Sequence, residues 1–527
     1  MRFRLTALAL LLSLPGFAQR EFDGERWWSH VKYLAADDMQ GRGTGTAGYL
    51  VAARFVAAEF ERAGLAPGGT NNYFQMVRFR TRLVTDEGTS VSIERDGQQT
   101  PLAIAEDVLV SARVPAAPTM DAGLVFAGYG LTIPEAQYDD FASLDVKGKI
   151  VVFLTGAPAN VPGALAAHFQ SVAERSKNLQ RLGAIGTLSI GNPAHSDLPW
   201  SRIASARAIA AMSLVDSTDD ESAGMKIGLV LNPASADKIL AGSGHTFGEI
   251  LEADHQNKPL PHFPLPGTLR AKVHAETTEV ESPNVIAKLE GSDKKLKDEY
   301  VVYSAHLDHL GVGPAINGDS IYNGAMDNAS GVAAMLDVAA YLHEKSIKPK
   351  RSILFVAVCG EEKGLLGSRY FATHPTVGAK QIVADINTDM FLPLFPLNLL
   401  TVYGLAESTL GDDIQAAAKS VDVKIQPDPE PLRNVFIRSD QYSFIRQGIP
   451  SLSMKVGYLQ DSPEEKIAKT WLAQRYHAPS DDLDQPVDRA AAGKFDHVIA
   501  NLLVRVANDK QRPQWKADSF FRRFATD

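Results

Sequence analysis

The chain has 527 residues, 45% of them hydrophobic and 22% charged, and a formal net charge of -9. These values are typical of a globular protein in water, and the length exceeds what one ordinary hydrophobic core organises, so we expect two or three domains. No block of basic residues stands out, which argues against a surface for nucleic acid or for an anionic membrane.

The first residues have the pattern of a secretory signal peptide. Arg2 and Arg4 form a short positive region, residues 5–14 are an apolar run too short to anchor the chain in a bilayer, and small residues follow. We predict a signal peptide over residues 1–18, cleaved after Ala18, and hence an exported protein, periplasmic or secreted. A buried N-terminal helix is the alternative interpretation. Later segments predict no membrane anchor.

The next part of the chain changes from helical to β-type patterns. Residues 22–65 have the spacing of two helices, joined by a glycine-rich segment at 40–46 that lacks the lysine and the preceding strand of a phosphate-binding loop. From about residue 80 to 275 short β-type runs dominate, with a helical stretch near 171–182. This predicts a β-rich domain with a few helices, ending near a proline-rich segment at 258–266.

From about residue 283, apolar strands alternate with helices. Residues 300–305, 353–359 and 381–387 predict buried strands, and residues 329–342 predict a helix. This alternation is typical of a mostly parallel mixed sheet flanked by helices, so the predicted fold class is α/β. The single cysteine, Cys359, ends the second strand, where a buried thiol is a better interpretation than a nucleophile.

Polar side chains gather at the ends of these predicted strands, which is the edge where open α/β sheets bind ligands. Burying so many carboxylates together is unfavourable unless cations neutralise them, so a metal cluster explains the pattern best. The residues are His306 and Asp308 after the first strand, Glu361 and Glu362 after the second, Asp389 after the third, and Asp327 before the helix.

Two of these pairs also have simpler interpretations. Side chains two apart in a strand point to the same face, so the Asp308 carboxylate could fix the tautomer of a metal-bound His306 ring, or the two could form a surface pair. Adjacent acids such as Glu361 and Glu362 point in different directions, so one can bind metal while the other holds a water. Acids are also common at the start of a solvated helix.

The remaining candidates are ambiguous when taken singly. Asp327 could be a helix N-cap, Asp389 could be any loop acid, and a loop histidine such as His477 is usually solvated. The hypothesis therefore depends on the joint pattern and its order along the chain.

Five separated motifs resemble, in this order, metallopeptidase family twenty-eight, which comprises co-catalytic zinc aminopeptidases and glutamate carboxypeptidases. Residues 34–43 also resemble the N-terminal helices of that family, and residues 126–130 and 144–149 resemble a protease-associated domain often inserted in it. The five motifs are residues 306–311, 322–331, 360–368, 387–390 and 477–481.

The resemblance implies the zinc exopeptidase fold with an inserted β-rich protease-associated domain. The implied boundaries are residues 19–80 for the N-terminal part of the peptidase domain, 81–275 for the inserted domain and 276–527 for the metal-binding part. It also implies two Zn²⁺ ions per chain, each with three protein ligands and an open position. In this arrangement Asp327 bridges both ions, His306 and Asp389 complete one site, and Glu362 and His477 complete the other.

The resemblance further implies the catalytic groups. Glu361 would be the general base that takes a proton from a shared water. Asp308, which the strand spacing makes the expected partner of the His306 ring, is the second candidate catalytic residue. A cis peptide bond is expected between Asp327 and Asn328. Gln441 departs from the family pattern, which usually has histidine there; because that position is not a metal ligand, substrate preference is in question rather than zinc binding.

These residues predict a secreted zinc-dependent exopeptidase that acts on peptides. An aminopeptidase is favoured because no arginine cluster for a substrate carboxylate can be assigned. The alternatives are a glutaminyl cyclase-like acyl transferase with one working zinc, and a receptor-like relative without catalysis. The sequence does not indicate the oligomeric state or the preferred side chain.

Overall fold

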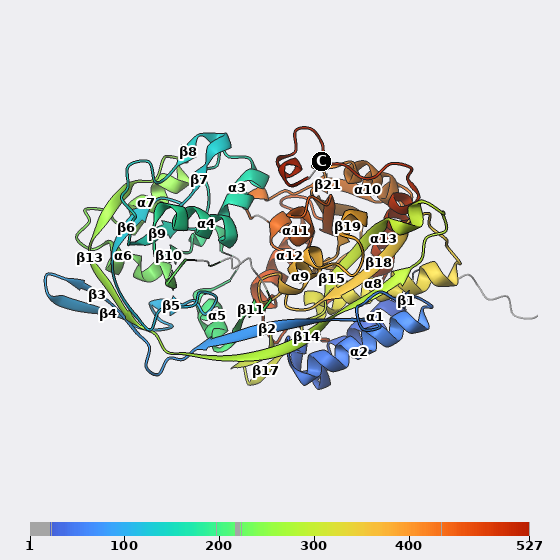
Figure 1. Cartoon of the computed structure of the whole chain (residues 1–527), viewed down its shortest axis with the longest axis horizontal. Coiled ribbons are helices and arrows are strands. Elements are labelled where there is room, and N and C mark those ends of the chain that lie inside the picture. Colours follow the sequence, from blue (N-terminus) through green and yellow to red (C-terminus); the bar gives the residue numbers. More distant parts are fainter. Residues whose placement is uncertain are drawn as a thin grey trace, which may run out of the picture.

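Two sheets organise the chain (Figure 1). The computed structural model describes residues 22–525 except 23, 197, 217–221, 223 and 434. The predicted signal peptide, residues 1–18, lies outside the described residues. Within the described part, no helix has the length and apolar character needed to cross a bilayer.

The first domain is built on a ten-stranded sheet. Its order is β11-β2-β14-β18-β15-β19-β22-β20-β21, with β1 beside β14. The four central strands, β18, β15, β19 and β22, are parallel, whereas β2 and β14 pair antiparallel with their neighbours. The sheet is therefore parallel at its centre and antiparallel toward the β2 edge. The strands are β1 (Ala66–Pro67), β2 (Phe74–Val84), β11 (Ala211–Leu214), β14 (Ala275–Leu289), β15 (Tyr300–His306), β18 (Ser352–Val358), β19 (Ile382–Asn387), β20 (Leu399–Tyr403), β21 (Lys424–Pro427) and β22 (Ser451–Val456).

Helices cover both faces of this sheet, which explains why its central strands are apolar throughout. On β18, Ile353, Phe355 and Ala357 face the larger core, while Leu354 and Val356 face a smaller core that includes residues of α9 and α11. The larger core contains side chains of α1, α2, α8, α10 and α13. The helices of this domain are α1 (Glu25–Leu34), α2 (Ala47–Arg62), α8 (Ser330–Glu344), α9 (Leu366–Thr373), α10 (Leu410–Lys419), α11 (Gln441–Ile445), α12 (Pro463–Gln474) and α13 (Arg489–Asn508).

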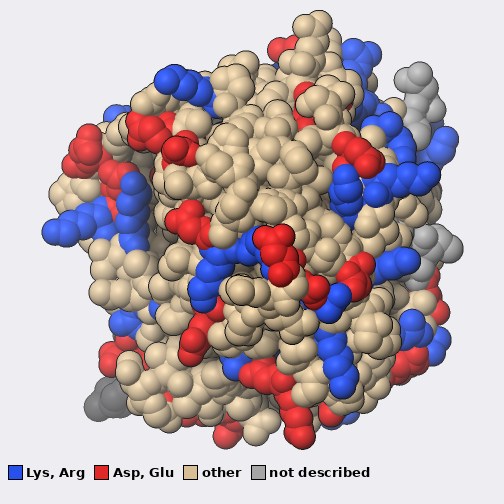
Figure 2. All heavy atoms as spheres, turned by 90° about the vertical axis from the view of Figure 1, so that its left-hand side faces the viewer, with Lys and Arg blue, Asp and Glu red and all other residues tan. Residues whose placement is uncertain are grey.

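The second domain has an eight-stranded sheet in the order β4-β3-β13-β6-β9-β10-β12-β5 and a separate core. Its outward face, shown in Figure 2, carries charges of both signs in small groups around an uncharged area. The strands are β3 (Ser90–Arg95), β4 (Gln98–Leu102), β5 (Val108–Val110), β6 (Thr119–Ala127), β9 (Ile150–Leu154), β10 (Gly186–Ile190), β12 (Ile227–Leu231) and β13 (His262–Lys272). The helices are α3 (Gly163–Gln170), α4 (Val172–Leu182), α5 (Trp200–Ser205), α6 (Ala236–Leu240) and α7 (Phe247–His255).

Two short hairpins complete the strands. β7 (Thr132–Ile133) pairs with β8 (Tyr138–Asp139), and β16 (Gly311–Ile316) pairs with β17 (Asp319–Tyr322). The strand β11 lies within the segment predicted as the inserted domain, yet it pairs with β2 in the first sheet. The identification of the second domain as a protease-associated domain, with its boundaries, stays a prediction.

The two domains meet in several places, among them a strand ribbon and an apolar cluster. β2 and β14 form a long antiparallel ribbon that runs from the first sheet toward the second (Figure 1), paired from Phe74 opposite Val285 to Val84 opposite Ala275. The second contact is an apolar cluster in which Ala167 of α3 joins side chains from the C-terminal part of the chain. Beside it, His168 Nδ1 lies 3.0 Å from the Tyr442 hydroxyl.

Candidate metal centre

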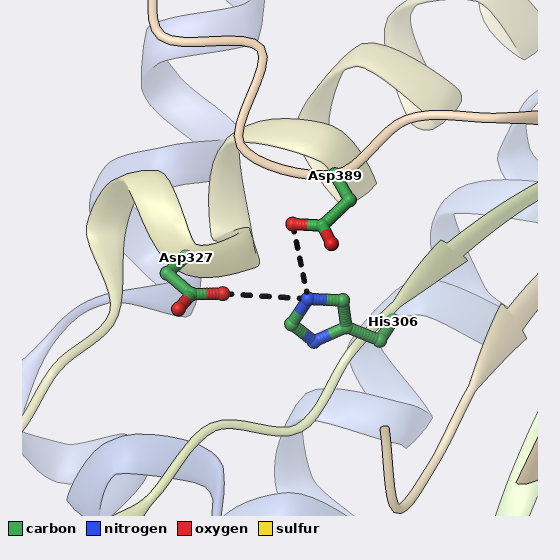
Figure 3. A group of neighbouring side chains, drawn as sticks. All are labelled: His306, Asp327 and Asp389. Atoms are coloured by element: carbon green, nitrogen blue, oxygen red, sulfur yellow. Dashed lines mark ion pairs between the residues drawn. The ribbon is translucent and has the colours of Figure 1, made fainter. Parts of the chain in front are cut away.

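A buried histidine and two carboxylates converge at the end of the parallel strands (Figure 3). His306 ends β15, and Asp389 follows β19. Asp327 lies in the short turn Ala325–Ala329 before α8, where its own backbone angles are not helical. His306 Nε2 is 3.3 Å from Asp327 Oδ1 and 3.5 Å from Asp389 Oδ1. Because strands β15 and β19 are parallel neighbours, their C-terminal ends bring these side chains to one place.

A second group shares Asp327. His477 Nε2 lies 3.3 Å from Asp327 Oδ2 and 3.2 Å from Glu362 Oε2. Asp327 thus presents one carboxylate oxygen to each histidine. The structure brings together all five residues that the sequence proposes as metal ligands. His306, Asp327 and Glu362 are buried, whereas the side chain of His477 is 23% exposed and that of Asp389 15%, so the centre opens on that side.

The distances fit two divalent cations. Zinc bonds to nitrogen and oxygen are about 2.0–2.2 Å long, so two ligand atoms of one tetrahedral zinc lie about 3.3–3.5 Å apart. The four nitrogen–oxygen distances, 3.2–3.5 Å, match this edge length. Asp389 Oδ1 and Glu362 Oε1 are buried and have no hydrogen-bond partner among the described residues, as expected of oxygens that face a cation.

Charge supports the same interpretation. Burial by itself raises the pKa of Asp327 and Glu362, yet the facing histidines hold both pKa values below their ordinary range. For His306 and His477 the two effects are reversed. Burial lowers the pKa of each histidine, but the facing carboxylates raise it by more, so the net shift of each pKa is well upward. The site therefore favours positive charge between these groups, which either imidazolium protons or metal ions supply.

Glu361 differs from its neighbour Glu362. Burial, followed by the repulsion of Glu362 and Asp389, raises the Glu361 pKa well above its ordinary value, against the attraction of His306. Its side chain forms none of the close histidine contacts that hold Glu362. Such a carboxyl group is suited to hold a proton, and a cation beside it would bring its pKa down into the working range.

The structure corrects the expected contact of Asp308. The His306 ring donates from Nδ1 to the backbone oxygen of Asp308, at 3.0 Å, rather than to its carboxylate. The strand ends at His306, so the alternation of side chains does not extend to Asp308. The carboxylate instead accepts from the Thr44 hydroxyl at 2.9 Å and from the Glu361 backbone N–H at 3.1 Å. Either contact places the ring proton on Nδ1 of His306, so the lone pair of Nε2 stays available to bind a metal ion.

Three buried groups that position the centre were not singled out from the sequence. The Asp481 carboxylate accepts from the backbone N–H groups of Met326 and Asp327, at 2.9 and 3.0 Å. The Arg42 guanidinium donates to four backbone carbonyls under the centre. His309 lies beside Oε1 of Glu362, whereas His477 lies beside Oε2. Asp481 and His309 lie in the motifs at 477–481 and 306–311, which was the available signal, and Arg42 lies in the glycine-rich segment.

Two further expectations concern the peptide bond after Asp327 and the role of Gln441. The peptide bond between Asp327 and Asn328 is cis, which confirms that prediction. Gln441 is buried and links two elements, since its Oε1 accepts from Asn387 at 2.7 Å and its Nε2 donates to the Phe436 carbonyl at 2.8 Å. Gln441 thus supports the end of β19, two residues before Asp389.

The mixed sheet and this concentration of potential ligands define a candidate metal site on an α/β fold. Residues 284–503, which include all five proposed metal ligands, match the model of peptidase family M28.

Curated proteins and a solved structure are also similar to this chain. A probable zinc metalloprotease of Pyrenophora teres f. teres is 38% identical over 107 residues, which are 20% of this chain and 22% of that protein. Aminopeptidase YwaD of Bacillus subtilis is 25% identical over 407 residues, 77% of this chain and 72% of that protein. An aminopeptidase from Aneurinibacillus sp. strain AM-1 has the same fold, with a TM-score of 0.56 at 20% identity over 92% of this chain and 93% of that one.

Proposed function

We propose that the chain is an exported aminopeptidase that uses two zinc ions to hydrolyse peptide bonds. The observation that carries the proposal is the pair of ligand groups that share Asp327, each with the spacing of a zinc site. The ligands are His306, Asp327 and Asp389 for one ion, and Asp327, Glu362 and His477 for the other.

Bound zinc would supply Lewis acidity that polarises the scissile carbonyl and stabilises the developing oxyanion. The chain supplies the proton transfers. Glu361 takes a proton from the attacking water while the water oxygen bonds to the carbonyl carbon, and it gives that proton to the amine nitrogen as the carbon–nitrogen bond breaks. The partly exposed His477 and Asp389 mark the side from which a peptide enters.

A small cavity beside the centre is the candidate subsite for the terminal side chain of the substrate. It is lined by Leu392, three residues after Asp389, and by apolar side chains that include Phe395, Tyr458 and Leu472. Lys455 also lines it and is close enough to Asp389 for that carboxylate to raise its pKa, although burial lowers it overall. Asp428, Glu430 and Arg433 also line the cavity, which therefore has apolar walls and charges of both signs.

The aminopeptidase direction is supported by the names of two relatives that align over most of this chain, the Bacillus and Aneurinibacillus aminopeptidases. A carboxypeptidase is the competing function, because carboxypeptidase Q of rat also aligns, at 27% identity over 35% of this chain.

The test uses the purified chain without residues 1–18. Metal content is measured first, and hydrolysis is then followed on a panel of aminoacyl anilides and on N-blocked dipeptides with a free carboxyl end. We expect two zinc ions per chain and cleavage of the anilides only. A single zinc, or cleavage of the N-blocked dipeptides alone, would contradict the proposal, and N-terminal glutamine cyclisation would favour the acyl transferase.

A further inference from the structure

His309 is a third imidazole at the metal centre. Its backbone N–H donates to the Arg42 carbonyl at 3.2 Å, and its side chain is fully buried. Gly324, with φ of +61°, lies against the ring, since a Cβ there would be 2.5 Å from the ring carbon Cγ of His309. The ring is therefore held tightly, and the left-handed glycine beside it leaves the space that the ring occupies.

The ring faces two of the proposed ligands. His309 Nδ1 lies 2.8 Å from Glu362 Oε1 and 3.8 Å from Asp327 Oδ2. Glu362 thus has one oxygen beside each of two histidines, Oε2 beside His477 and Oε1 beside His309. The three residues His309, Asp327 and Glu362 are close enough to hold one metal ion.

The direction of the contact separates a ligand from a simple hydrogen bond. Within the described part of the chain, His309 Nδ1 and Nε2 and Glu362 Oε1 are all buried without a hydrogen-bond partner, so the 2.8 Å contact lacks the alignment of an N–H···O bond. An Nδ1 lone pair turned toward a carboxylate would be repelled. A cation bound to both atoms removes the conflict if Glu362 binds through both of its oxygens. The zinc then has five protein ligand atoms instead of a tetrahedral set, and ligand atoms about 90° apart on it lie about 3 Å from each other.

We propose that His309 Nδ1 is a further ligand of the zinc ion held by Asp327, Glu362 and His477. The His309 and His477 rings have centroids 5.8 Å apart at 66° to each other, which leaves one ion between them. This zinc site then has two imidazole ligands, whereas the other zinc site has only one, His306. Imidazole-rich sites favour zinc over magnesium or calcium, so the two sites differ in affinity and fill in order, this one first.

This inference rests on the proposed zinc centre, and the experiment keeps the two apart. The zinc-loaded full chain is crystallised, and the distance from each zinc to His309 Nδ1 is measured. In parallel, zinc affinities are determined by competition with a chromogenic chelator for the wild type, for His309→Ala, and for His309→Ala with added imidazole. His30→Ala is the matched control, because His30 is also buried but lies on α1, outside the cluster.

We expect a His309 Nδ1 distance of about 2.0–2.2 Å to one zinc only. His309→Ala should bind one of its two zinc ions at least tenfold more weakly, imidazole should restore that affinity, and His30→Ala should keep both. A distance of 3 Å or more in the wild type overturns the inference, whatever the variants do. Wild-type protein with fewer than two zinc ions would instead refute the proposed function.

Discussion

Arg42 offers a quantitative test of how the centre is positioned. Its fully buried guanidinium donates to the backbone carbonyls of Leu307 at 2.9 Å, Leu34 at 2.7 Å, Asn323 at 2.7 Å and Gly324 at 2.9 Å. It therefore connects α1, the segment after His306 and the segment before Asp327. Burial lowers the Arg42 pKa to about 10, against the attraction of nearby carboxylates, so the group is charged at neutral pH.

Arg42→Ala removes all four donors at once. A hydrogen bond with a charged donor contributes about 1.5–3 kcal/mol, and a buried carbonyl left without a partner costs about 1–3 kcal/mol. These terms are not additive, but even a quarter of their sum gives a loss of about 3–6 kcal/mol. That is a large part of the 5–15 kcal/mol typical of a folded domain. Arg42→Lys keeps the charge but not the planar fork, so an intermediate loss is expected.

The assay is urea unfolding followed by tryptophan fluorescence, since Trp27 lies in the larger core, together with zinc affinity. Arg62→Ala is the control, because Arg62 is on α2, its side chain is 71% exposed and it forms an ion pair with Glu59. An exposed pair of this kind contributes about 0–1 kcal/mol. If Arg42→Ala unfolds within 1 kcal/mol of Arg62→Ala, or binds zinc as the wild type does, the positioning role of Arg42 is wrong.

Three further predictions concern the chemistry and the domain contact. Glu361→Gln should keep both zinc ions and lose about 10²–10⁴-fold in rate, whereas Glu362→Gln should lose zinc; metal analysis beside kinetics decides, and the opposite pattern reverses the two roles. Chelation should abolish hydrolysis, and added zinc, but not magnesium, should restore it; activity that persists in a metal-free sample would exclude a zinc mechanism. Burial lowers the pKa of His168 to about 4, so the unfolded chain binds its proton first, and stability falls as the pH drops from about 6.5 toward 4. At pH 5 the expected loss in the free energy of unfolding is about 2 kcal/mol, measured by urea unfolding. His168→Asn should remove that part of the pH dependence, and an unchanged pH dependence in the variant would refute the prediction.

The strands and their acidic ends could be predicted because several signals coincide there. β15, β18 and β19 are apolar along their whole length, and each predicted strand agrees with the structure to within one residue at either end. Their order in a parallel sheet then brings His306 and Asp389 together, whatever the loops do.

The remaining features depend on contacts between distant segments, which local patterns do not carry. The direction of the Asp308 carboxylate follows from Thr44, which is 264 residues away in sequence. Arg42 resembles any loop arginine until the carbonyls around it are known. His309 was missed because it follows Asp308 in the motif at 306–311, where His306 and Asp308 already accounted for the polar residues. β11 is four residues long, too short to show which sheet it joins.

The β2–β14 ribbon makes the second domain detachable in principle. The chain leaves the first sheet along β2 and returns along β14, and at the far end Val84 stands directly opposite Ala275. A two-residue turn is enough to join antiparallel partners at such a position. Residues 85–274 could therefore be excised, or exchanged for another module, without rethreading the strands that carry the ligands. Of the first sheet, only the edge strand β11 would go with them. A topology of this kind lets evolution, or an engineer, alter the second domain while the metal centre keeps its frame.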